Sequence, residues 1–469
     1  MPNPSLSRRE MLRGMAAAGG LGALGVGGLG SVLSGCGSNH HPLARTTSVS
    51  GPASGNGLRM PDSLVHPHLP PGTDSLPGRL DHVIVLMMEN HSFDNYFGML
   101  GKGDGFALSH GRPTAATADA QGRMVRSFHM PNECQLHSKP SNSWNATHIS
   151  WDQGRMDGFA RSQSGPVSMG YWTGADLPFY YSLAKTFPLA DRYFASVMAQ
   201  TYPNRRFLMA ASAYGLISDP LPQPTDPAPP NGTIFDRLDQ HGLSWRNYYS
   251  SLPTTFLIPS VIKGTGINNV KRIESFFADA AGGTLPSFCI VDPDFGKQSE
   301  EDPQYIGAGE AFASKVINAV MSGPAWSKSL LLWCYDEHGG YYDHVPPPPA
   351  PVPDSVPPNI HVPPDQPGGY DRYGLRVPAV VVSPHAKPNH VSHDVYDHTS
   401  VLKLLESKWN LPAISHRDAN ANDLTDCLDL HGPPAFIHPP TLAAPGDTPA
   451  RAACLQTGPG QIPPAGSIT

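Results

Sequence analysis

The fold of this chain is decided by one stretch, Leu330-Leu331-Leu332-Trp333-Cys334-Tyr335, which stops at Asp336-Glu337. An apolar run without alternating polar residues is typical of a strand buried on both faces of a parallel sheet. The runs 82–88 and 377–382 have the same character, and each also stops at a polar cluster. Three such strands predict a parallel sheet at the centre of the chain.

Stretches with helical spacing separate the predicted strands. The clearest are Ala308 to Met321 and Ser400 to Lys408. Two proline-rich stretches, 220–230 and 346–367, are expected to be surface loops inserted into the same domain. We therefore predict an α/β fold with a mostly parallel central sheet, helices on both faces and irregular Pro-rich insertions.

The polar clusters after the strands carry the candidate site. In an open α/β sheet the ligand lies at the carboxyl ends of the strands, so we expect the clusters to share one edge. They are Glu89-Asn90, the segment that begins with Asp336-Glu337, and Ser383-Pro384-His385. Glu89-Asn90 offers hard oxygen donors suited to a divalent cation, although the pair could instead cap a following helix.

The segment Asp336 to His344 is the strongest signal. It contains three carboxylates and two histidines, which repel one another when buried unless a positive group gathers them. Gly339 and Gly340 allow the backbone to turn tightly around a bound group. A structural ion-pair network is the alternative, but the segment contains no Lys or Arg to form one. We therefore predict a metal site here.

Another candidate is Gln200-Thr201-Tyr202-Pro203-Asn204-Arg205-Arg206. A Thr hydroxyl is a poor nucleophile at neutral pH, and coordination to a metal is one way to activate it. Arg205 has a planar fork that can clamp a phosphoryl group. Taken alone, the motif is usually no more than a turn followed by the start of a helix.

Two histidines complete the set taken from the residues themselves. His148 lies in the segment 145–151, and His398 follows Asp397 at the start of a predicted amphipathic helix. We predict that both histidines stabilise charge on phosphate or protonate the leaving oxygen. The alternative for Asp397 is an ordinary N-terminal cap.

In this order, the segments resemble a phosphoesterase family that includes bacterial non-haemolytic-type phospholipases C and a class of acid phosphatases. The resemblance begins with the strand 82–88 and Glu89-Asn90-x-Ser92-Phe93-Asp94-x-x-Phe97-Gly98, and it extends to about residue 429. It continues through Gly154-x-Met156-Asp157-Gly158-Phe159, Thr201-x-Pro203-Asn204-Arg205, Tyr335 to Pro347, Arg376-Val377-Pro378 with Ser383-Pro384, and Tyr396 to Glu406. Coincidence across six ordered segments is improbable.

This family is similar in fold to alkaline phosphatase and sulfatases, so the resemblance implies an alkaline-phosphatase-like fold. It also implies that one divalent metal ion is bound by Glu89, Asn90, Asp336 and Glu337, and that Thr201 is the metal-bound nucleophile. His148 would contact the phosphoryl oxygens. In-line attack by Thr201 would give a phospho-threonine intermediate, which water then hydrolyses.

The chain departs from the family at one point. Relatives carry a histidine before a proline upstream of the Asp-Glu pair, whereas this chain has Glu301-Asp302-Pro303. A carboxylate at Asp302 therefore replaces a phosphate-contacting histidine, which puts the substrate preference and the leaving-group acid in doubt. The candidates to replace that histidine are His338, His344 and His398.

The expected function is hydrolysis of phosphoric esters, and first of all a phospholipase C that acts on the phosphodiester of phospholipid headgroups. An acid phosphatase acting on small phosphate monoesters is the alternative within the family. A sulfatase is disfavoured because its nucleophile position needs Cys or Ser instead of Thr201. The alternative from another class is a catalytically silent, ligand-binding surface lipoprotein.

The first 36 residues are predicted to be a targeting segment. Ser7-Arg8-Arg9-Glu10-Met11-Leu12 before the Gly/Ala-rich run 15–33 resembles a twin-arginine export signal. The run ends at Leu33-Ser34-Gly35-Cys36, which resembles a lipoprotein cleavage box with Cys36 as the lipidated residue. A membrane-anchoring helix is the alternative. We expect export by the twin-arginine route to the periplasm or cell surface, and attachment to the membrane through the lipid anchor.

Composition indicates the domain limits, argues against nucleic acid as a partner and limits the number of disulfides. Residues 37–76 are rich in Ser, Pro, Gly and His and are predicted to be a flexible tether, and residues 77–469 a single phosphoesterase catalytic domain. The formal charge of −7 gives no basic surface for nucleic acid. Five of the six cysteines remain after Cys36, which in an oxidising compartment allows one or two disulfides. Cys334, inside an apolar run, is predicted to be free and buried.

Overall fold

The structure is a computed structural model of the chain, and it describes residues 57–135 and 139–446. The predicted targeting segment, Cys36 and the first part of the predicted tether lie outside the described residues. Within them, no helix is both long and apolar enough to span a lipid bilayer.

An eight-stranded sheet forms the centre, in the order β10-β9-β11-β1-β12-β13-β8-β14. Its strands are β1 (His82–Met88), β8 (Leu189–Ala190), β9 (Trp245–Tyr249), β10 (Val270–Arg272), β11 (Phe288–Asp292), β12 (Ser329–Tyr335), β13 (Ala379–Val382) and β14 (Val391–Ser392). Neighbouring strands from β10 to β12 are parallel, whereas β13 runs antiparallel to β12 and β8. The predicted mostly parallel sheet is confirmed.

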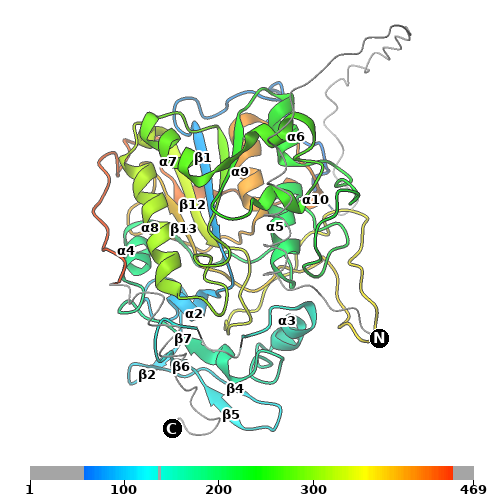
Figure 1. Cartoon of the computed structure of the whole chain (residues 1–469), viewed down its shortest axis with the longest axis vertical. Coiled ribbons are helices and arrows are strands. Elements are labelled where there is room, and N and C mark those ends of the chain that lie inside the picture. Colours follow the sequence, from blue (N-terminus) through cyan, green and yellow to red (C-terminus); the bar gives the residue numbers. More distant parts are fainter. Residues whose placement is uncertain (1–56, 136–138, 447–469) are drawn as a thin grey trace, which may run out of the picture. The chain divides into compact units, whose positions relative to one another are not determined.

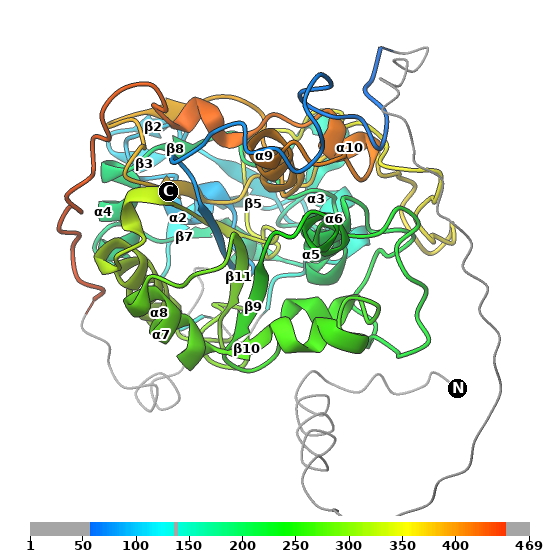
Figure 2. The same cartoon turned by 90° about the horizontal axis from the view of Figure 1, so that it is seen from above.

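Helices cover both faces of this sheet. Helices α4, α7 and α8 lie on one face, and α5, α6, α9 and α10 lie on the other (Figures 1 and 2). The helices are α2 (Phe93–Phe97), α3 (Trp144–Trp151), α4 (Pro178–Thr186), α5 (Thr201–Ala210), α6 (Ile234–Gln240), α7 (Ile273–Gly282), α8 (Ile306–Ser322), α9 (Thr399–Trp409) and α10 (His416–Ala419). The predicted helices correspond to α8 and α9, so this part of the α/β prediction is also confirmed.

Smaller elements lie beyond one edge of the central sheet, where β1 leads into α2 (Figure 1). They are helix α3 and three two-stranded sheets, namely β2 (Leu108–Ser109) with β3 (Arg112–Pro113), β4 (Ala116–Ala118) with β5 (Met124–Arg126), and β6 (Phe128–His129) with β7 (Gly170–Tyr171). The segments 220–230 and 346–367 contain no helix and no strand of the central sheet, as predicted. The insertions thus lie outside the central sheet and do not interrupt it.

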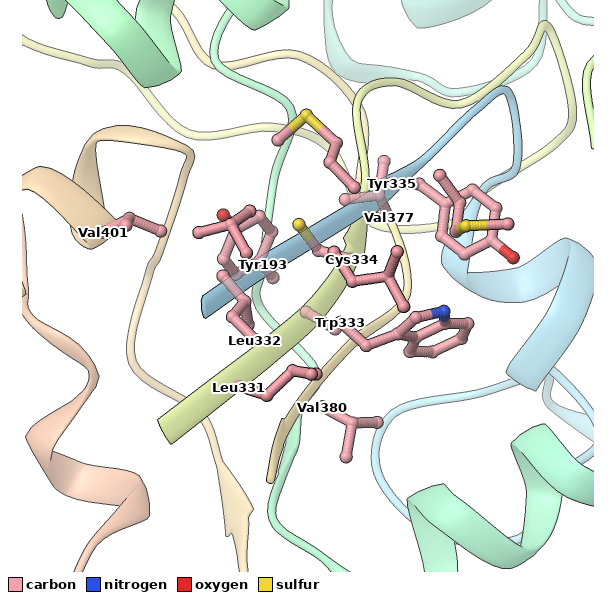
Figure 3. Packing of buried hydrophobic residues seen from close by; sticks show 14 of the residues in the cluster. Tyr193, Leu331, Leu332, Trp333, Cys334, Tyr335, Val377, Val380 and Val401 are labelled. Atoms are coloured by element: carbon pink, nitrogen blue, oxygen red, sulfur yellow. The ribbon is translucent and has the colours of Figure 1, made fainter. Parts of the chain in front are cut away.

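Strand β12 shows why the deciding stretch has no polar residues. Every residue of the strand is buried. Figure 3 shows Leu332 and Cys334 on the side of Val401 from α9, with Trp333 on the opposite side. Because successive side chains of a strand point to opposite faces, a strand covered by helices on both faces needs apolar residues throughout. Cys334 is free and buried, as predicted.

One expectation about the sheet is wrong. The cluster Ser383-Pro384-His385 follows β13, but β13 runs antiparallel to β12. Its carboxyl end therefore lies at the opposite edge from Glu89 and Asp336, and the Ser383 hydroxyl donates to the carbonyl of Ser329 at the start of β12 (2.9 Å). A continuous apolar run indicates a buried strand but does not give its direction.

The predicted flexible tether is wrong over residues 59–76, which hydrogen-bond to the end of α9 and to the segment that follows it. Asn410 has a positive φ after the last turn of α9, and its amide donates to the carbonyls of His66 (3.0 Å) and Leu69 (2.9 Å). The buried ammonium of Lys408 donates to the carbonyl of Leu76 (2.7 Å). This segment thus satisfies two buried polar side chains, that of Lys408 in the last turn of α9 and that of its C-cap Asn410, by a long-range pairing that composition does not reveal.

Candidate active site

Four predicted metal ligands meet at the carboxyl ends of β1 and β12. These strands are parallel neighbours paired to their last residues, so Glu89-Asn90 and Asp336-Glu337 leave the sheet side by side. The backbone N–H of Asn90 donates to Asp336 Oδ1 (3.3 Å). All four side chains are at most 2% exposed. The structure therefore brings together the four residues that the sequence analysis grouped.

Gly339 and Gly340 let three segments approach one another at this point. Gly339 has a φ of +66°, and a Cβ built on it would lie 1.9 Å from the carbonyl oxygen of Asn90. Gly340 has a φ of +87°, and a Cβ there would lie 2.7 Å from the backbone nitrogen of Ser141. Only glycine fits both constraints. The predicted tight turn thus holds the segment after β12 against the segment after β1 and against the start of α3.

Asn142 is a site residue that the sequence analysis missed. Its side-chain Nδ2 donates to Glu337 Oε1 (2.6 Å) and to Asn90 Oδ1 (3.2 Å). One amide therefore orients two predicted ligands at once. The only sequence feature that marks Asn142 is its position directly before Ser143, the N-cap of α3. An Asn before a helix is too common to predict contact with metal ligands.

Thr201 begins helix α5, and the rest of its motif fixes this position. Pro203 lies in the first turn, where a helix needs no intrahelical N–H donor. The Asn204 side chain accepts from the N–H of Val197 (3.0 Å) and donates to the carbonyl of Ala199 (2.9 Å). The loop before the helix is thus held to its first turn. Thr201 Oγ1 is buried and has no hydrogen-bond partner among the described residues.

Arg205 does not have the predicted role of a phosphoryl clamp. Its guanidinium is 1% exposed, and Nε donates to Asp336 Oδ2 (3.0 Å). The other nitrogens donate to Thr254 Oγ1 (3.1 Å) and to the carbonyls of Met87 (3.3 Å) and Met88 (3.1 Å). Every branch of the fork is occupied by the protein itself. Arg205 therefore neutralises and anchors Asp336 instead of facing a substrate.

Both ring nitrogens of His398 are hydrogen-bonded within the protein. Its Nε2 donates to the backbone carbonyl of Asp336 (2.7 Å), and Nδ1 accepts from the hydroxyl of Tyr193 (3.3 Å). Burial lowers the pKa of His398 to about 4, so the ring is neutral. The ring holds the backbone of a ligand residue, and its predicted role towards phosphate or the leaving oxygen stays a prediction. Asp397 caps α9 by accepting from the N–H of Thr399 (3.2 Å), which confirms the alternative given for it.

His148 lies on α3 beneath a Pro-rich insertion. Its Nδ1 donates to the carbonyl of Trp144 (2.7 Å), and burial lowers its pKa to about 4. Its Nε2 has no partner among the described residues and faces Gly368, where a Cβ would lie 2.5 Å from it. No hydrogen bond between described residues joins His148 to Thr201 or to the four ligands. Its contact with phosphate stays a prediction.

His344 belongs to a different cluster. Its Nδ1 donates to Asp94 Oδ2 (2.7 Å), and Nε2 lies 3.3 Å from Asp104 Oδ1. Asp94, Asp343 and His344 place ligand atoms within 4.8 Å of one another. However, the buried guanidinium of Arg376 already binds Asp343 (2.9 Å) and Asp94 (3.2 Å). Arg376 supplies positive charge to both carboxylates, so these contacts stabilise the fold, while the predicted catalytic role of His344 stays a prediction.

This cluster predicts a pH dependence of stability. Burial alone lowers the pKa of His344, but the hydrogen bond to Asp94 and its charge outweigh burial and raise that pKa to about 9. Since the folded pKa lies above the unfolded value of about 6.5, protonated His344 stabilises the fold below about pH 6.5, and this contribution disappears as the pH rises through about 9. Because a third of the ring is exposed, we expect a loss of about 1–2 kcal/mol. Urea unfolding of the wild type and His344→Gln at both ends of this range measures it, and parallel pH curves would contradict it.

Asp302 contacts the loop that follows Asp336-Glu337. It is 4% exposed, and the hydroxyl of Tyr341 donates to its Oδ2 (3.0 Å). Burial raises its pKa well above the ordinary value. No hydrogen bond between described residues connects Asp302 to Thr201. Its contact with Tyr341 orders the loop that carries Gly339 and Gly340.

The four grouped residues fit a divalent cation by their donor chemistry. They offer carboxylate and amide oxygens, which are hard donors. Burial raises the pKa of both Asp336 and Glu337, that of Glu337 to about 8. Arg205 compensates Asp336, while Glu337 is bonded to the uncharged amides of Asn142 and Gly339. A further positive charge is needed to keep both carboxyls ionised at neutral pH.

Comparison with known proteins identifies the family of the chain. The model of the Phosphoesterase family matches residues 80–412. Phospholipase C B of Mycobacterium tuberculosis is 31% identical over 431 residues, covering 77% of this chain and 81% of that protein. Non-specific phospholipase C1 of Arabidopsis thaliana is 30% identical over 381 residues, covering 73% and 70%. A protein in the alkaline phosphatase superfamily from Vibrio parahaemolyticus is similar in structure, with 10% identity, a TM-score of 0.39 and coverage of 77% and 74%.

The protein is therefore a hydrolase that acts on phosphoric ester bonds. Within that class, the match over residues 80–412 spans well over half of the chain. The chain belongs to the phosphoesterase family.

Proposed function

We propose that this chain is a metal-dependent phospholipase C in which Thr201 is the nucleophile. The observation that carries the proposal is the hydroxyl of Thr201, which is buried, without a hydrogen-bond partner among the described residues, and placed at the start of α5. One turn further on, Arg205 anchors the helix to Asp336, a predicted ligand. The relatives named phospholipase C support a phospholipid substrate.

Helix α5 prepares Thr201 for attack. The N-terminal end of a helix carries a partial positive charge, which favours a developing alkoxide and the negative phosphoryl group of the substrate. Attack forms a bond between Thr201 Oγ1 and phosphorus and breaks the bond from phosphorus to the diacylglycerol oxygen, and the proton that the hydroxyl loses balances the one that diacylglycerol takes up. Water then hydrolyses the phospho-threonine, which still carries the headgroup, releases the phosphorylated headgroup and regenerates the hydroxyl.

The surrounding residues hold the metal ligands in place. Glu89, Asn90, Asp336 and Glu337 would bind the cation, whose charge lowers the pKa of a nearby hydroxyl and neutralises charge on the phosphoryl group. Asn142 orients Asn90 and Glu337, while His398 fixes the backbone of Asp336. Outer residues of this kind fix the orientation of ligands and contribute to metal affinity.

Export by the twin-arginine route and a lipid anchor at Cys36 complete the proposal. Both rest on the sequence 1–36, which lies outside the described residues. The intact mass of the mature protein tests them, since a cleaved and lipidated chain begins at Cys36 with added acyl chains.

The first test compares two chromogenic substrates with and without a chelator. We expect the purified protein to release p-nitrophenol from p-nitrophenyl phosphorylcholine, a diester, and to lose at least about 90% of this activity with a chelator because the cation neutralises the phosphoryl charge. Cleavage of p-nitrophenyl phosphate alone would make the protein an acid phosphatase. Cleavage of neither substrate under any divalent metal would favour the silent lipoprotein.

A further inference from the structure

Asp219 stands beside the predicted nucleophile although it lies beyond the other end of α5 in sequence. The chain leaves α5 after Ala210 and returns to the start of the same helix. There Asp219 Oδ1 accepts from the backbone N–H of Tyr202 (2.7 Å). Tyr202 directly follows Thr201. A half-buried carboxylate therefore lies one residue from the hydroxyl that attacks phosphorus.

The position that Asp219 takes is one that suits an anion. Free N–H groups and the helix dipole at the start of a ten-residue helix attract negative groups. The buried, unpartnered Oγ1 of Thr201 independently marks where a phosphoryl group must approach.

We propose that Asp219 is a specificity-determining residue that disfavours phosphomonoesters and so directs the site towards phosphodiesters. A phosphomonoester carries nearly two negative charges at neutral pH, because its second pKa is about 6, whereas a diester carries one. A carboxylate beside the nucleophile repels the extra charge. This inference deepens the proposed function and rests on it, since it requires Thr201 to be the nucleophile.

A purely structural role for Asp219 uses the same contact. The N-cap residue of α5, Gln200, makes no side-chain capping bond, so Asp219 caps the helix from a distance. Asp219→Asn separates the two roles. The amide oxygen can still accept from the Tyr202 N–H and keeps the size of the side chain, while the negative charge is lost.

The experiment measures kcat/KM of the full chain for p-nitrophenyl phosphate and p-nitrophenyl phosphorylcholine at neutral pH. For Asp219→Asn we expect about a tenfold rise with the monoester and less than about a twofold change with the diester. The control is Asp226→Asn, which removes a carboxylate from the adjacent Pro-rich loop, where it accepts from the N–H of Gln223 (2.9 Å). This control is expected to leave the ratio of kcat/KM for the two substrates unchanged.

Two results would overturn the inference: an unchanged ratio of the two kcat/KM values in Asp219→Asn, or a wild type that prefers the monoester. If Asp219→Asn does not fold, Asp219→Ser keeps an acceptor without the charge, and the same ratio decides. A failure of the proposed function looks different. In that case neither the wild type nor the variants show chelator-sensitive turnover of either ester.

Discussion

Replacing Thr201 by valine is expected to lower kcat by a factor on the order of 10³ or more while the protein stays folded. Removing a nucleophile deletes the route through the covalent intermediate, and such losses are usually large. Valine has nearly the same shape. Because Thr201 Oγ1 has no hydrogen-bond partner among the described residues, its removal leaves no donor or acceptor unsatisfied there. Single-turnover kinetics with p-nitrophenyl phosphorylcholine measures the loss.

Two controls make the result specific. The midpoint of thermal unfolding should stay close to that of the wild type, and calorimetric titration should still show cation binding, because Glu89, Asn90, Asp336 and Glu337 remain. Thr201→Ser keeps a hydroxyl at the same place and should retain most of the activity. An unchanged rate in Thr201→Val would contradict the proposed mechanism, and a loss of folding would show that the hydroxyl is structural.

Much of the sheet and the ligand group was predictable because both depend on local sequence. The stretch 330–335 is buried on both faces, so it needs apolar residues at every position, and such an unbroken apolar run is visible in the sequence. Once β1 and β12 are parallel neighbours, Glu89-Asn90 and Asp336-Glu337 must leave the sheet at the same edge. Parallel strands therefore convert a sequence pattern directly into a three-dimensional site.

What could not be predicted depends on contacts between distant segments. The direction of β13 is set by its partners, so the cluster after it was placed at the wrong edge. Asn142 and Asp219 reach the site from loops, and neither residue type is unusual in a loop. The charge on Arg376 was visible in the sequence, but its burial between Asp94 and Asp343 was not. A cation site and an ion-pair site look alike until the counter-charge is located.

The second large effect is expected for stability when Arg205 is replaced. Its size distinguishes the observed role of Arg205, as the partner of Asp336, from its predicted role as a phosphoryl clamp. Arg205→Ala should lower the free energy of unfolding by about 3–5 kcal/mol, because it leaves Asp336 as a buried charge without its partner. Asp292, whose Oδ1 lies 3.6 Å from Arg205 Nη1, loses the same counter-charge. The carbonyls of Met87 and Met88 also lose their donor. Urea unfolding of the metal-free protein measures this loss.

The neighbouring arginine provides a matched control. Arg206 is also buried, but it donates to the carbonyl of Leu257 and lies over the ring of Tyr214 (4.3 Å), with no carboxylate within salt-bridge distance among the described residues. Arg206→Ala should therefore cost only about 1–2 kcal/mol, since it leaves no buried carboxylate behind. Arg205→Lys keeps the charge but not the planar guanidinium. Its loss in the free energy of unfolding should lie between those of Arg205→Ala and Arg206→Ala. If Arg205→Ala instead keeps wild-type stability and raises KM, the guanidinium contacts the phosphoryl group, and the role inferred from the sequence would be restored.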